Sequence, residues 1–157
     1  MKKIILSTTI LVILLFGFFI IKNGIGSMQE NIYNDNEKIV SSADSYAYRN
    51  RTGGNKNRKT NISFYLTGME TLWAIKSDTD TDIKIEYSSK IDEGNLKVAL
   101  ISPEDEVSTI FEGTGNGQIK LPVQEGSSRI KIVGKKASGS ISFEIFGNDN
   151  LRIIPKN

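Results

Sequence analysis

The chain has 157 residues, of which 38% are hydrophobic and 24% charged, and its formal net charge is +2. This length fits one folded domain with additional segments. Because the chain has no cysteine, disulfide bonds, cysteine zinc sites, thiol catalysis and a lipid anchor on an N-terminal cysteine are excluded. The absence of histidine removes the usual general base near neutral pH and the commonest transition-metal ligand.

The N-terminus carries an uncharged apolar segment, residues 4–21, in which fourteen of eighteen residues are Ile, Leu, Val or Phe. A helix of this length spans about 27 Å, close to the ~30 Å hydrocarbon core of a bilayer. We therefore expect residues 1–27 to form a membrane anchor, with residues 4–21 in the lipid bilayer. Lys2 and Lys3 precede the segment, and Lys22 is the one basic residue directly after it. Because positive charge favours the cytoplasmic side of a membrane span, the N-terminus should be cytoplasmic and the residues after the span extracellular. The alternative is a signal peptide that is removed, which would give a secreted protein.

Residues 28–60 are predicted to be a polar stalk followed by a basic linker. Apolar residues recur at helical spacings between residues 28 and 50, which favours a short amphipathic stalk. Residues 49–61 hold five cations, two adjacent glycines and no acidic residue, as is typical of a linker. No aromatic residue is interleaved among these cations, and the overall charge is near zero, so we expect no nucleic-acid partner.

From residue 61 onward the hydrophobic period becomes two. Apolar residues alternate with polar ones in short segments bounded by Gly, Pro, Asn, Asp or Ser, a pattern that indicates antiparallel strands. The expected strands are residues 62–66, 72–75, 83–87, 96–100, 107–111, 119–121, 130–132 and 141–145. The sequence thus predicts an all-β protein: an antiparallel, jelly-roll-like β-sandwich of about eight strands over residues 61–157, preceded by one transmembrane helix and the stalk.

Four short motifs within this region resemble a known family. They are residues 94–98 (GNLKV), Ser102-Pro103, residues 129–132 (RIKI) and residues 139–143 (GSISF). Together they resemble the pre-peptidase C-terminal domains of bacterial secreted peptidases, and small anchored or secreted Firmicutes proteins that carry one such domain alone. The resemblance implies a β-sandwich accessory or binding module that is not a catalyst.

The sharpest candidate site is the alternating acidic run Asp78, Asp80 and Asp82, which matches the opening of a calcium loop. An EF-hand needs Gly next and a bidentate Glu at its twelfth position, where this chain has Ile83 and Ser89. Two interpretations are left: a weak extracellular calcium site, and a solvated turn between two strands. We expect no other cofactor.

Two further groups of residues have side chains suited to chemistry. Residues 104–106, Glu-Asp-Glu, are adjacent on one predicted turn and splay outward, unlike the opposed carboxylates of a glycosidase. Trp73 is expected in the core, whereas exposure of Trp73 beside Tyr65 would indicate sugar stacking.

These observations predict a non-catalytic, membrane-anchored extracytoplasmic module that binds a protein or cell-wall partner. The alternative is a secreted binding protein with weak calcium or carbohydrate affinity.

Overall fold

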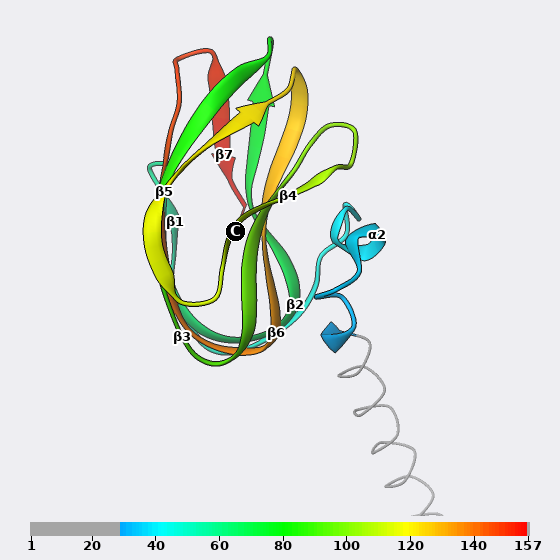
Figure 1. Ribbon diagram of the computed structural model, residues 1–157, viewed down its shortest axis with the longest axis vertical. Helices are drawn as coiled ribbons and strands as arrows, with labels where there is room; N and C mark the ends of the chain where they lie inside the picture. Colours follow the sequence, from blue (N-terminus) through cyan, green and yellow to red (C-terminus); the bar gives the residue numbers. More distant parts are fainter. Residues whose placement is uncertain (1–28, 157) are drawn as a thin grey trace, which may run out of the picture.

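The structure is a computed structural model that describes residues 29–156, and within them every strand pairing is antiparallel. A short helix, α2 (Asn36–Ile39), precedes the strands (Figure 1). The strands are β1 (Ser45–Lys56), β2 (Lys59–Ser77), β3 (Thr81–Ile101), β4 (Val107–Glu112), β5 (Gly115–Val123), β6 (Gly126–Phe146) and β7 (Leu151–Pro155). The all-β antiparallel prediction is confirmed.

Three long strands, β2, β6 and β3, lie side by side and bend, so that each contributes to two layers (Figure 1). In the first layer the order is β1, the first half of β2, the second half of β6, the first half of β3, and β5. In the second layer the order is β7, the second half of β2, the first half of β6, the second half of β3, and β4. The two layers face each other as a β-sandwich.

The bend of β3 occurs at Gly94, which lies within the second of two register shifts of the β3–β6 pairing, between Glu93 and Asn95. Its φ of +71° belongs to the left-handed region, which favours glycine. A Cβ at this position would stand 2.1 Å from the carbonyl oxygen of Lys136 on β6. Glycine is therefore required there by backbone conformation and by the close approach of the neighbouring strand.

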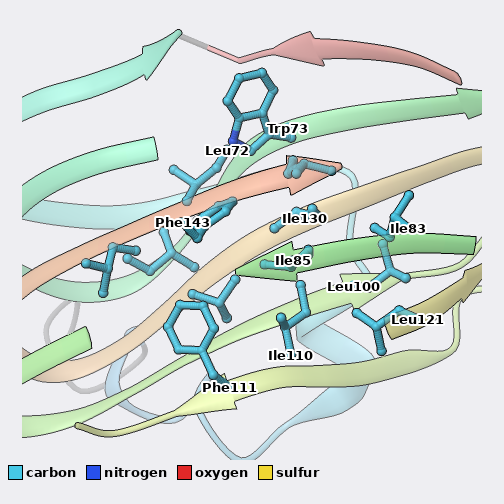
Figure 2. Packing of buried hydrophobic residues seen from close by; sticks show 14 of the residues in the cluster. Leu72, Trp73, Ile83, Ile85, Leu100, Ile110, Phe111, Leu121, Ile130 and Phe143 are labelled. Atoms are coloured by element: carbon cyan, nitrogen blue, oxygen red, sulfur yellow. The ribbon is translucent and has the colours of Figure 1, made fainter. Parts of the chain in front are cut away.

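The core fills the space between the layers (Figure 2). Ile62, Phe64 and Leu66 of β2 point inward from the first layer, while alternate residues of the same strand are solvent-accessible, as expected for a half-buried strand. Trp73 joins the core at 1% exposure, and its indole Nε1 donates a hydrogen bond to Thr60 Oγ1 at 2.7 Å. The prediction that Trp73 is a core residue is confirmed.

The segment before β1 packs on the outer face of the second layer. Two of its side chains, Ile32 and Ile39, are buried there in a second apolar cluster with Met69, Ala99 and Val133 of the sheet. The outer face of this layer is therefore covered on one side by residues 32–43.

The structure differs from the sequence prediction in residues 28–60. Residues 45–56, expected to be stalk and linker, form β1 and pair with β2. The helical stripe expected over residues 28–50 is reduced to α2, because the apolar side chains of this segment pack on the sheet and not along a helix.

The predicted short strands are partly merged: six of the eight belong pairwise to β2, β3 and β6. The membrane segment, residues 4–21, lies outside the described residues. Within residues 29–156, no helix is both long and apolar enough to cross a bilayer.

Candidate functional site

A groove of about 500 Å³ opens on the outer face of the second layer, beside β7, and we call it the β2–β7 groove. Its lining combines aromatic, aliphatic, hydroxyl and charged side chains from β1, β2, β6, β7 and the segments next to them. These residues are Ser42, Asp44, Tyr46, Glu70, Thr71, Ala74, Lys76, Ser127, Arg129, Ile154 and Lys156.

The two large hydrophobic side chains that stand out as exposed among residues 29–156 both lie in this groove. Tyr46 is 45% exposed and Ile154 is 36% exposed. Binding sites characteristically combine apolar and aromatic contact surface with a few placed polar groups. The groove has this composition, and it is the candidate functional site.

Strand register explains why the groove is hollow. Ala74 on β2 lies between Ile154 on β7 and Arg129 on β6, its direct cross-strand partners. In the next row of the same face, Lys76 has Ser127 as its β6 partner. Because the side chains of Ala74 and Ser127 are short and those beside them are longer, the surface is depressed at these positions.

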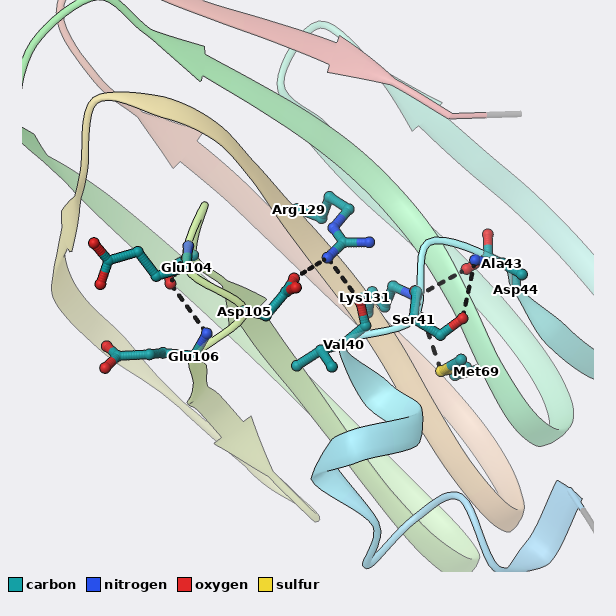
Figure 3. Close-up of polar contacts among 11 residues, drawn as sticks. Val40, Ser41, Ala43, Asp44, Met69, Glu104, Asp105, Glu106, Arg129 and Lys131 are labelled. Atoms are coloured by element: carbon teal, nitrogen blue, oxygen red, sulfur yellow. Dashed lines mark hydrogen bonds and ion pairs between the residues drawn. The ribbon is translucent and has the colours of Figure 1, made fainter.

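One wall of the groove is the segment before β1, which two cations hold against the sheet (Figure 3). Arg129 Nη2 donates to the carbonyl oxygen of Val40 at 2.8 Å, and the fully buried Lys131 Nζ donates to that of Ser41 at 2.6 Å. Lys131 also forms an ion pair with Asp44, with Nζ 3.3 Å from Oδ1. Burial lowers the pKa of Lys131, and the charge of Asp44 opposes that shift.

The two carboxylates of the groove are both engaged by protein donors. Asp44 accepts hydrogen bonds from the backbone N–H and the hydroxyl of Thr71, at 3.0 and 2.8 Å. Buried Glu70 accepts one from the Tyr48 hydroxyl at 2.6 Å and pairs with Arg51 at 3.4 Å. Burial raises the pKa of Tyr48, and the hydrogen bond to Glu70 raises it further. These carboxylates hold the walls of the groove in place.

A second, more open depression of about 580 Å³ lies on the outer face of the first layer. Its charged side chains include Lys59, Glu86 and Glu144. Lys59 pairs with Glu144 at 3.0 Å, and Glu86 pairs with Lys84 at 2.9 Å. This face is therefore polar with its charges largely paired, as expected for the solvated side of an antiparallel sandwich.

The predicted calcium ligands serve separate contacts in and around the β2–β3 turn. Asp80 Oδ1 accepts the backbone N–H of Glu125 at 2.8 Å, and Asp82 forms an ion pair with Lys120 at 2.7 Å. Asp78 lies exposed in the turn itself. Within residues 29–156, no three acidic, histidine or cysteine side chains gather closely enough to hold a metal ion.

Residues 104–106, Tyr65 and Trp73 lie in different parts of the fold. Residues 104–106 lie between β3 and β4, and the Ser102 hydroxyl accepts the backbone N–H groups of Glu104 and Glu106. Tyr65 lies in the first half of β2, with the guanidinium carbon of Arg49 5.5 Å from its ring centroid, whereas Trp73 is buried in the second half of the same strand.

Sequence reasoning missed the residues that make the groove. Tyr46 and Tyr48 alternate with Ala47 and Arg49, and this period of two was a readable strand signal. The meeting of β1 with Ile154, more than 100 residues later, depends on strand pairing that no local pattern contains.

A scan against models of known protein families found no match for this chain, and a search of curated proteins found none either. Several solved structures are similar to it. One is Xyl-CBM35 in complex with a glucuronic acid-containing disaccharide, at 11% identity over 73% of this chain and 90% of that one, with a TM-score of 0.41. Others are CBM35 from Cellvibrio japonicus Abf62 (10% identity, 71% and 82% coverage, TM-score 0.38) and a CBM4 structure (12%, 73% and 81%, 0.37). At these values the similarities assign neither a family nor a ligand to the chain.

Proposed function

We propose that this protein is a non-catalytic binding module, displayed outside the cell by its N-terminal membrane segment, and that it takes its ligand in the β2–β7 groove. The observation that carries the proposal is the composition of the groove. Tyr46 and Ile154 are exposed there, while the two carboxylates of the groove, Asp44 and Glu70, are held by hydrogen bonds and ion pairs and are not free to act as acid or base. Such a groove offers a preformed contact surface.

The predicted anchor would keep the module close to the membrane. Seven residues, 22–28, separate the predicted span from the first described residue, and Ile32 is already buried against the sheet. Seven residues reach at most about 25 Å when fully extended. The partner we propose is therefore a component of the cell envelope, either protein or wall polymer. The resemblance to pre-peptidase C-terminal domains stays a prediction that agrees with such an accessory role.

Fractionation combined with protease treatment of intact cells tests the display. The intact-mass protein should sediment with membranes, and external protease should remove residues 29–157 without lysis. A product in the medium that lacks the first residues would contradict anchoring, and protection until lysis would contradict external display.

Co-sedimentation with purified cell-envelope fragments tests the groove. The full chain, kept in a non-ionic detergent, should bind the fragments, and Tyr46→Ala should weaken binding about tenfold through loss of the aromatic contact. Tyr65→Ala is the matched control, because it removes an accessible tyrosine that does not line the groove. Equal binding by both variants would refute the assignment of the groove.

A further inference from the structure

The charges of the β2–β7 groove are unbalanced once their contacts are considered. Both carboxylates, Asp44 and Glu70, already face protein donors. Lys76 and Lys156 are exposed and form no ion pair with any residue in 29–156. The groove therefore presents positive charge, although the chain from residue 28 onward has 17 basic and 18 acidic residues.

Arg129 adds a third cation with donors to spare. Only its Nη2 has protein acceptors within residues 29–156, namely the Val40 carbonyl and one carboxylate oxygen of Asp105 at 2.9 Å. The side chain is 19% exposed and lines the groove. A guanidinium whose position is fixed on one nitrogen offers its other N–H groups to a carboxylate or phosphate in a planar arrangement.

The sheet also tolerates a repulsive pair beside the groove. Lys76 on β2 and Arg152 on β7 are direct cross-strand partners, and like charges in that position destabilise a sheet. Lys84 and Lys120 are also direct cross-strand partners on the first layer, but there Lys59, Lys84 and Lys120 each have an acidic partner within 3.0 Å. The charges of Lys76 and Lys156 are thus not compensated by ion pairs within residues 29–156, and they lie on the side of the molecule that carries Tyr46 and Ile154.

We propose that the β2–β7 groove binds an anionic envelope polymer, with Lys76, Lys156 and Arg129 contacting its carboxylate or phosphate groups and with Tyr46 and Ile154 contacting its rings or carbon chain. This proposal rests on the proposed function and names the ligand class for the same groove. Acidic sugars and polyol phosphates share the recognised chemistry, an oxyanion repeated along a hydroxylated chain. The three cations bind the oxyanions of the polymer, and the side chains of Tyr46 and Ile154 determine where the polymer lies in the groove.

Titration calorimetry on the full chain in a non-ionic detergent tests this with three polymers: polygalacturonate, its fully methyl-esterified form, and poly(glycerol phosphate). The methyl ester has the same backbone without charge. At least one anionic polymer should bind at least tenfold more tightly than the methyl ester, and raising salt from 50 to 200 mM should weaken binding. Binding of polygalacturonate alone assigns a carboxylate source, and binding of poly(glycerol phosphate) alone assigns a phosphodiester source.

Two matched double variants each remove two positive charges, one from the groove and the other from the first layer. Lys76→Gln/Lys156→Gln should weaken anionic binding about tenfold, whereas Lys59→Gln/Lys120→Gln on the first layer should leave it unchanged. The proposal is overturned if the anionic polymers bind no more tightly than the methyl ester, or if the two double variants behave alike. If the proposal is overturned in this way, the envelope assay with Tyr46→Ala distinguishes a wrong ligand class from a wrong binding site. Loss of envelope binding in Tyr46→Ala would mean that only the ligand class is wrong. Unchanged envelope binding would mean that the groove is not the binding site either.

Discussion

Replacing Gly94 by alanine tests how the long strands bend into two layers. Gly113, in the β4–β5 turn, provides a matched control because its φ of +66° is nearly the same as the +71° of Gly94. The surroundings differ: a Cβ at Gly113 would meet no atom of residues 29–156 within 4 Å, whereas a Cβ at Gly94 would lie 2.1 Å and 2.5 Å from the carbonyl oxygens of Lys136 and Lys135. The two substitutions therefore share the conformational strain, and only one adds a backbone collision.

The expected magnitudes follow from this difference. A non-glycine residue in the left-handed region costs roughly 1–2 kcal/mol, which applies to both variants. At Gly94 the neighbouring strand must also withdraw by more than 1 Å to reach ordinary contact distance, and such overpacking typically costs about 1–3 kcal/mol. We expect Gly113→Ala to lower the free energy of unfolding by about 1–2 kcal/mol and Gly94→Ala to lower it by about 2–5 kcal/mol.

Urea unfolding followed by far-UV circular dichroism, on the full chain in a non-ionic detergent, measures both values under the same conditions. Equal losses for the two variants would refute the reasoning, because they would show that β3 and β6 do not approach closely at the bend.

Three other predictions concern the polar contacts. Asp44→Ala should lower the free energy of unfolding by about 3 kcal/mol, because it leaves Lys131 buried without its carboxylate partner. Adding Lys131→Met to this variant should recover most of the lost free energy. A double variant as unstable as Asp44→Ala alone would contradict this explanation. Tyr48→Phe should cost about 1–2 kcal/mol at neutral pH, because Glu70 loses a hydrogen bond. Since folding raises the pKa of Tyr48 above its ordinary value of about 10, the tyrosine contributes stability that is complete below pH ~10 and is lost as the pH rises above it, where the unfolded chain ionises first. Urea unfolding between pH 9 and 11 should therefore show that the free energy of unfolding falls less with rising pH in Tyr48→Phe than in the unsubstituted protein. An equal fall in both proteins would contradict the role given to Tyr48. Millimolar calcium should leave the Tm unchanged, because Asp80 already accepts a backbone N–H; a rise of several degrees would argue for a metal site.

The fold was predictable from sequence to the level of class, because alternation is a local signal. The inward residues of β2, such as Ile62 and Phe64, were identified correctly as one face of a strand. What the local signal could not show is that a glycine such as Gly68 or Gly94 bends a strand and does not end it, so continuous strands were divided at these points. In β1, the adjacent Gly53 and Gly54 hid a strand that pairs with β2.

The candidate site was less predictable, because it is made by cross-strand neighbours that are distant in sequence. Ala74 becomes the floor of the groove only when β6 and β7 place Arg129 and Ile154 on either side of it. The acidic run beginning at Asp78 resembles a calcium loop because its members alternate in sequence, yet Asp80 contacts the β5–β6 turn and Asp82 contacts β5.

Thiol labelling of intact cells tests the central claim most directly, since the chain has no cysteine of its own. Ile154→Cys places a single thiol in the β2–β7 groove, and Ser142→Cys places one on the exposed outer face of the first layer. A membrane-impermeant maleimide should label both variants on intact cells, and the groove thiol should react several-fold more slowly there than in purified protein, because envelope ligand covers it. Labelling that requires lysis, or two thiols that react on cells at the rates of the purified protein, would contradict a displayed module with an occupied groove.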